Sequence, residues 1–268
     1  MMHTRILALF LAATTLLVCA TIPARAAEPN ATAPLVIHVI VPLCSNAQID
    51  CGSPAAGAPG RLATNLYWGA LFGHRRFLDR KQSEFTRIDV ARGKGPLLER
   101  AVYRRMIPAS GRTIEQIVVL DAYHGDSIDQ ALDMFWHRAT RGGVVHFRDG
   151  DQDREVRVSI AGYAGHNRLM DGVELPAVPN GRASPIPSFV LACASEPWFG
   201  PALRAAGSET LVMTRTLMAP EGYVLDAVVR AIGDGAAPVQ IRRSAVNAYA
   251  KWQKLSESVA GTIFAKPE

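Results

Sequence analysis

The sequence lacks an apolar run long enough to cross a bilayer. The longest run, residues 6–20, has about fifteen residues, whereas a membrane-spanning helix needs about twenty. Val18 stands before Cys19, where a lipoprotein signal requires a small residue. We therefore expect no membrane anchor, whether a spanning helix or a lipid.

Several familiar catalytic and cofactor-binding motifs are also missing. The chain has no Gly-x-Ser-x-Gly elbow, which argues against a serine esterase. Gly93 and Gly95 lack the third glycine of a dinucleotide-binding loop. There is no His-Glu-x-x-His motif, and Cys44 and Cys51 are too far apart for a zinc knuckle. We therefore expect no cofactor and no metal ion.

Charge of one sign is not concentrated anywhere in the chain. The formal net charge is +5, from 29 basic and 24 acidic residues. The basic pairs at residues 75–76, 104–105 and 242–243 are scattered and carry no interleaved aromatic residues. We therefore expect no nucleic-acid partner.

The N-terminus has the pattern of a secretory signal peptide. Arg5 precedes the apolar run, and Ala24-Arg25-Ala26 stands before a cleavage point. The pattern predicts a signal peptide over residues 1–26 and a periplasmic or secreted protein. Residues 27–268 have the length of a single α/β domain, and 49% hydrophobic content allows a full core.

Cysteine is scarce, and the expected mature chain keeps an odd number. Cys44 and Cys51 flank a loop and can form a disulfide in an oxidising compartment. Cys193 is then left alone. A lone cysteine is commonly a small packing residue, so its surroundings must decide whether it is reactive.

Strand and helix patterns alternate along the chain and predict a mostly parallel sheet with helices on both faces. Five apolar runs predict buried strands, at residues 35–43, 115–122, 156–162, 189–192 and 210–214. Helical spacing occurs at residues 62–81, 127–141, 198–206, 220–232 and 241–259. Two half-polar strands at residues 84–91 and 98–107 predict an inserted hairpin.

Potential catalytic residues follow three of the predicted strands. In mostly parallel sheets of this kind, ligands bind beyond the carboxyl ends of the strands. Asp121 and His124 follow the second strand, His166 follows the third, and Cys193 follows the fourth. If the third and fourth strands are neighbours, the imidazole can take the thiol proton and return it to a leaving group. Backbone N–H groups at Cys193 and in the turn from Gly165 to Asn167 can then face an oxyanion.

This arrangement resembles the caspase-like superfamily of cysteine peptidases, which includes caspases, legumains, gingipains and separases. In that family one hydrophobic strand ends in His-Gly and the next ends in Ala-Cys or Ser-Cys. Residues 189–193 match the second block. In the first block Gly165 precedes His166, and Asn167 stands where the family has glycine. The resemblance implies a His166 and Cys193 dyad in a caspase-like fold.

His124 is the alternative histidine, because His124-Gly125 is a literal His-Gly pair after a hydrophobic strand. Asp121, at the same strand end, can orient its imidazole or can be a turn residue. A helix and a strand separate this block from Cys193, which favours His166.

The chain is also similar to a group of exported bacterial proteins of unknown function, through residues 65–69, 165–171 and 217–223. That likeness implies location rather than activity. Together these features predict an exported thiol-dependent hydrolase, most simply a cysteine peptidase with a peptide or protein substrate. The alternative is a caspase-like fold that has lost catalysis and binds a peptide or partner at the same strand ends.

Overall fold

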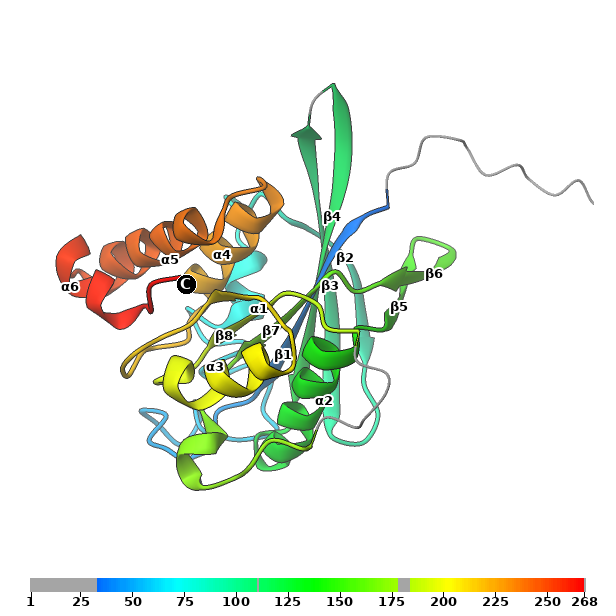
Figure 1. Ribbon diagram of the computed structural model, residues 1–268. Coiled ribbons are helices and arrows are strands. Elements are labelled where there is room, and N and C mark those ends of the chain that lie inside the picture. The colour runs from blue at the N-terminus through cyan, green and yellow to red at the C-terminus, as the bar shows by residue number, and fades with distance from the viewer. Residues whose placement is uncertain (1–32, 110, 178–183, 268) are drawn as a thin grey trace, which may run out of the picture. The chain divides into compact units, whose positions relative to one another are not determined.

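The computed structural model describes residues 33–109, 111–177 and 184–267, which contain a seven-stranded sheet (Figure 1). The strands lie in the order β2-β3-β4-β1-β7-β8-β9. Their bounds are β1 (Leu35–Pro42), β2 (Thr86–Arg92), β3 (Leu97–Ala109), β4 (Arg112–Tyr123), β7 (Ile160–Ala164), β8 (Ser188–Leu191) and β9 (Thr210–Val212). The predicted signal peptide, residues 1–26, lies outside the described residues.

The sheet is mostly parallel. β1 pairs in parallel with β4 on one side and β7 on the other, and β8 and β9 continue in the same direction. β2 and β3 are antiparallel to their neighbours and form the predicted inserted hairpin. The predicted α/β class is therefore confirmed, and the strand order is consistent with a caspase-like arrangement.

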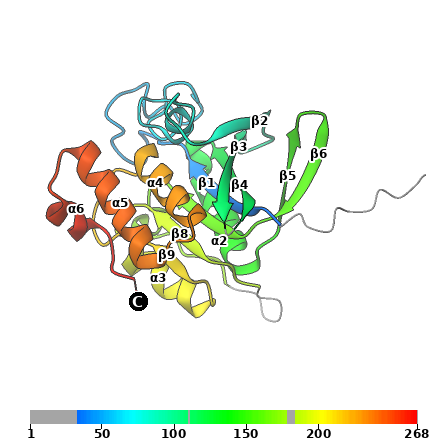
Figure 2. The ribbon, with the colours of Figure 1, turned by 90° about the horizontal axis from the view of Figure 1, so that it is seen from above.

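Helices cover both faces of the sheet, as Figures 1 and 2 show. One face packs against α1 (His74–Leu78), α4 (Gly222–Gly233) and α5 (Pro238–Gln253). The other packs against α2 (Ile128–Arg141), α3 (Ser195–Ala205) and a separate hairpin of β5 (Val144–Asp149) and β6 (Gln152–Arg157). Because β1 is covered on both faces, every residue after Leu35 in this strand is buried, as its continuous apolar run predicts.

A buried ion cluster lies on the α2 side of the sheet. The Asp121 carboxylate accepts a hydrogen bond from His38 Nε2 at 2.8 Å and two from Arg100, at 2.7 and 2.6 Å. Burial opposes the charge of Asp121, but His38 and Arg100 hold the pKa of this carboxyl well below its usual range. Burial lowers the pKa of His38, so Arg100 supplies the positive charge of the cluster.

Residues close to the C-terminal end cover the outer edge of the sheet beside β9. The N–H of Ala265 donates to Met213 O at 2.9 Å, and the N–H of Arg215 donates to Ile263 O at 2.7 Å. Ile263 ends the last helix, α6 (Glu257–Ile263). The chain just beyond β9 therefore has a backbone partner on its outer side.

The predicted helix over residues 62–81 was wrong for most of its length. The segment forms turns, and only the short α1 is helical. A Cβ at Gly69 would collide with the carbonyl of Leu62, and one at Gly73 would collide with the backbone of Trp68. The apolar spacing thus reflects a tightly folded loop whose side chains are buried.

Two other predicted elements are divided in the structure. The strand expected at residues 156–162 is split between β6 and β7, because the N–H of Val158 donates to Gly143 O outside either strand. The helix expected at residues 241–259 is interrupted at Lys254, whose φ of 56° is left-handed. Ser256 then caps α6 by accepting a hydrogen bond from the N–H of Val259.

The His74 imidazole is fully buried, and neither ring nitrogen has a hydrogen-bond partner among the described residues. Burial lowers the pKa of His74 to about 3 from its ordinary value of 6.5. Below pH 6.5 the unfolded chain therefore binds a proton here that the folded chain does not. The stability that depends on neutral His74 is complete above pH 6.5 and is lost as the pH falls toward 3.

Replacement of His74 by Phe should flatten this pH dependence. We expect the slope of the unfolding free energy to fall by about 1.4 kcal/mol per pH unit between about pH 6 and pH 4. Urea unfolding at a series of pH values measures the slope. Exposed His146→Gln is the control and should keep the parent slope; an unchanged slope in His74→Phe would contradict a neutral buried imidazole.

Candidate functional site

Cys193 lies in the sharp turn between β8 and α3. Ala194 follows it in the left-handed conformation, with φ 47° and ψ 38°, which is costly for a residue with a Cβ. The N–H of Ala194 donates to Thr216 O at 2.8 Å, and this bond helps to hold the turn. Cys193 is a free thiol and is partly exposed.

The Cys193 sulfur contacts the segment that follows β9. Its Sγ donates to Met218 O and accepts from the N–H of Met218, both at 3.4 Å. A backbone carbonyl, rather than an imidazole, therefore accepts the thiol proton in this state.

His166 lies just beyond β7, in a turn that requires glycine before it. A Cβ at Gly165 would lie 2.8 Å from Pro42 Cγ on the neighbouring β1. His166 Nε2 is 2.7 Å from Asp171 Oδ2, which also accepts from Arg168 Nη1 at 3.0 Å. Partial burial opposes the charge of Asp171, but these two hydrogen bonds hold its pKa below the usual range. The imidazole is thus oriented by an ionised carboxylate.

Asn167 joins the two strand ends. Its side chain is buried, and its Nδ2 donates to Cys193 O at 2.7 Å. Its Oδ1 accepts from the N–H of Leu169 at 3.1 Å, which fixes the turn that carries His166. No acceptor among the described residues takes the backbone N–H of Asn167 or of Cys193.

The pairing of β7 with β8 places the two turns at the same edge of the sheet. Ala164 is in register with Leu191, and His166 and Cys193 each follow by two residues. The structure therefore brings the turn of Gly165, His166 and Asn167 to Cys193. Within the described part of the chain, no hydrogen bond joins the His166 imidazole to the Cys193 sulfur.

Two tyrosines lie near the sulfur, and a glutamate lies near the tyrosines. Burial raises the pKa of both Tyr67 and Tyr249, and the proximity of Glu221 and Cys193 raises it further. Burial also raises the pKa of Glu221, against hydrogen bonds from Tyr223 and Gln253. The surroundings of Cys193 are thus aromatic and partly shielded from water.

His124, the alternative partner, lies elsewhere along the sheet edge. It follows β4, which is separated from β8 by β1 and β7. Its Nδ1 accepts a hydrogen bond from the N–H of Asp126 at 3.3 Å. Neither role left open for Asp121, orienting the His124 imidazole or forming the turn, is what the structure shows: Asp121 lies inside β4, and its carboxylate binds His38 and Arg100. The strand order therefore favours His166.

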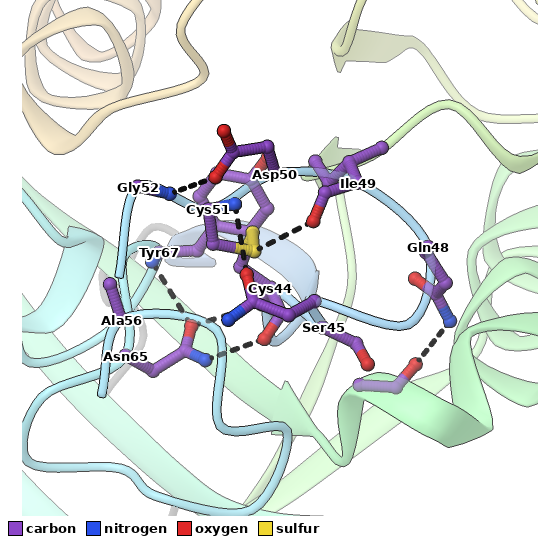
Figure 3. The surroundings of a disulfide bond; sticks show 12 residues. Cys44, Ser45, Gln48, Ile49, Asp50, Cys51, Gly52, Ala56, Asn65 and Tyr67 are labelled. Atoms are coloured by element: carbon purple, nitrogen blue, oxygen red, sulfur yellow. Dashed lines mark hydrogen bonds between the residues drawn. A yellow bond between two sulfur atoms is a disulfide. The ribbon is translucent and has the colours of Figure 1, made fainter. Parts of the chain in front are cut away.

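Cys44 and Cys51 form a disulfide, as predicted (Figure 3). Asn65 fixes this ring by accepting from the N–H of Cys44 at 3.0 Å and donating to its carbonyl at 2.8 Å. The same Asn65 Oδ1 accepts from the N–H of Tyr67 at 3.1 Å. The disulfide ring thus supports the segment that places Tyr67 beside the Cys193 site.

Two further observations concern only the described part of the chain. No three His, Cys, Asp or Glu side chains lie close enough together to hold a metal ion. No helix there has the length and apolar character that crossing a membrane requires.

Compared with known proteins, the chain matches no protein-family model, no curated protein and no solved structure. Its function must therefore be inferred from the geometry of the site.

Sequence reasoning missed two residues of this site. Asp171 follows His166 by five residues, and the short 3₁₀ helix η2 (Arg168–Asp171) turns its carboxylate back to the imidazole. A carboxylate shortly after a histidine is a weak signal that could have suggested this pair. Met218 contacts Cys193 through its backbone, so no side-chain pattern could have shown the contact.

Loss of the disulfide should destabilise the protein by about 2 to 3 kcal/mol, because the ring restricts the unfolded chain. Urea unfolding of the Cys44→Ala/Cys51→Ala variant against the parent measures the difference. Cys193→Ser, with the disulfide intact, is the control and should unfold close to the parent. Coincident midpoints for the parent and the double variant would contradict a stabilising disulfide.

Proposed function

We propose that this protein is an exported thiol-dependent hydrolase, most simply a cysteine peptidase, with Cys193 as nucleophile. His166 acts as general base and then general acid, and Asp171 is the residue that positions it. The observation that carries the proposal is the register of β7 and β8, which sets both residues two positions beyond paired strand residues. The 2.7 Å bond from Asn167 to Cys193 O adds to it, because it ties the histidine turn to the cysteine.

The proposed reaction begins when the side chains of His166 and Cys193 turn toward each other. The imidazole takes the thiol proton, and the sulfur attacks the substrate carbonyl to form a tetrahedral oxyanion. The N–H groups of Cys193 and Asn167 are available to stabilise that oxyanion. The amine leaves with the proton from the imidazolium, and the acyl group remains on sulfur as a thioester. Water, deprotonated by His166, then releases the carboxylic acid and returns the thiol.

Export is part of the proposal. The expected signal peptide argues for it, and the Cys44 and Cys51 disulfide fits an oxidising compartment. The resemblance to caspase-like peptidases at residues 189–193 favours a peptide or protein substrate.

The alternative is a non-catalytic fold that binds a peptide or partner at the same strand ends. One contact favours it: the Cys193 sulfur is bound by the Met218 backbone. Catalysis requires this contact to break, whereas peptide binding does not.

Iodoacetamide labelling of Cys193 at pH 7 should reveal whether His166 activates it. We expect His166→Ala to slow labelling about tenfold, because iodoacetamide reacts with the thiolate that the imidazole generates. Asp171→Asn should slow it by a smaller factor, since the ring loses its orientation but not its base. Mass spectrometry of the Cys193 peptide over time gives the rates.

His124→Ala is the matched control and should label at the parent rate. Circular dichroism establishes that each variant is folded, and labelling in denaturant establishes that the thiol is intact. Equal labelling rates of Cys193 in the parent and in His166→Ala would contradict the assignment of His166 as the catalytic base. A large drop in His124→Ala alone would transfer the role to that histidine.

Peptidyl chloromethyl ketones should separate a peptidase from a binding protein. A peptidase should form a covalent adduct on Cys193 at least about tenfold faster with one peptide sequence than with chloroacetone, which carries the same chloromethyl ketone and no peptide, because bound peptide holds the electrophile at the sulfur. Intact-mass measurement follows the adduct, and Cys193→Ser should form none. Peptides that bind without accelerating the adduct would support the non-catalytic alternative.

A further inference from the structure

A groove of about 350 Å³ runs between α4 and α5, away from the Cys193 turn. Figure 1 shows the two helices side by side, and the chain turns back between Gly233 and Pro238 to make them antiparallel neighbours. Small residues keep the groove open, since Ala227 and Ala231 of α4 face Ala248 of α5. Its volume is within the range of small-molecule sites.

Two polar stripes form the walls of the groove. Asp226 and Arg230 of α4 and Asp234, the C-cap residue of that helix, follow one another at intervals of four residues, so they lie along one side of the helix. Ser244, Asn247 and Lys251 lie on the facing side of α5 at intervals of three and four residues. The two walls together therefore offer hydroxyl, amide, carboxylate and cationic groups.

An aromatic platform closes one end of the groove. Trp252 is 37% exposed and lines the groove with Phe77 and Tyr223. Tyr223 stacks against Trp252 with ring centroids 5.9 Å apart, and Phe77 meets it edge-on at 5.7 Å. The Arg80 guanidinium lies 3.7 Å from the Phe77 ring centre and 5.1 Å from the Trp252 ring centre. Trp252 is thus a rigidly supported ring with an accessible surface.

The charges of the groove largely cancel within the protein. Arg230 donates to Asp226 at 3.0 Å and to Glu84 at 2.9 Å, and Asp234 pairs with Arg105 at 2.9 Å. The two carboxylates and two cations that line the groove sum to zero formal charge. Neither an anionic nor a cationic ligand therefore meets a complementary field.

The polar groups of the α5 wall remain available for a ligand. Among the described residues, no hydrogen bond or ion pair engages the side chain of Ser244 or Asn247. Lys251 instead contacts the aromatic platform, with its Nζ 5.6 Å from the Trp252 ring centre. Hydroxyl and amide groups that stand open beside an aromatic ring suit a molecule with many hydroxyl groups and an apolar C–H face.

We propose that this groove binds a neutral saccharide. One sugar ring packs its C–H face on Trp252, while hydroxyl groups of the chain hydrogen-bond to Asn247, Ser244 and the carboxylate of Asp226. The lining residues of the α4 wall run from Tyr223 to Asp234, about 17 Å at 1.5 Å per residue, which accommodates a short oligosaccharide. This site shares no lining residue with the His166 and Cys193 turns, so the proposal stands apart from the proposed hydrolase activity.

Isothermal titration of the full protein with cellotriose, maltotriose and the N-acetylglucosamine trimer tests the proposal. We expect at least one of the three to bind. Asn247→Ala should weaken that binding about two- to tenfold, the loss of a hydrogen bond or two. Ala248→Leu should weaken it about tenfold or more by narrowing the groove, and Trp252→Ala should weaken it more than Asn247→Ala does.

Arg243→Ala, on α5 but outside the groove, is the matched control and should bind as the parent does. Circular dichroism and the unfolding midpoint separate lost binding from lost folding. Asn247→Ala is the variant that should disturb the fold least, because Asn247 is exposed. Three results would overturn the proposal. The first is that the parent binds none of the three sugars, and the second is that binding survives Ala248→Leu unchanged. The third is that the parent binds glycine betaine and no sugar, because the aromatic residues would then recognise a quaternary ammonium group.

Discussion

The parallel pairing of β1 with two strands that are distant in sequence is the constraint on which the rest of the structure depends. β4 follows β1 after a long loop and a hairpin, and β7 follows only after α2 and a second hairpin. Because β1 lies between them, both of its backbone edges are paired, and the helices that pack on its two faces complete its burial. The pairing of β7 with β8 extends the same register, and that register sets His166 and Cys193 at one edge.

The sequence carried enough information to predict the sheet but not its finer divisions. Continuous apolar runs such as that of β1 indicate buried strands, and alternation with helices indicates parallel pairing. Residues 62–81 show where periodicity fails, because buried side chains of a folded loop can recur at helical spacing by chance. The loop is set by Asn65, which bonds the backbone of Cys44, a contact that no local pattern encodes.

Only the site residues that follow core strands could be predicted from the sequence. His166, Gly165, Asn167 and Cys193 could be grouped because each directly follows a core strand. The role of Asp121 could not be deduced, since its carboxylate turns inward to Arg100 on the inserted hairpin rather than toward the adjacent turn. Long-range polar pairs of this kind depend on how separate segments pack, which a single sequence leaves open.

The backbone bonds of Ala265 and Arg215 have a consequence for how the protein behaves at high concentration. A strand at the margin of a sheet offers unpaired N–H and C=O groups to other molecules, and such margins seed aggregation. Here residues 263–265 pair with residues 213–215, just beyond β9, so a neighbouring molecule cannot pair with the backbone of that segment. The opposite margin, β2, has arginines at residues 87 and 92, and charged side chains are another common way to discourage such pairing. The two margins of the sheet are thus protected differently, one by backbone pairing and the other by charge.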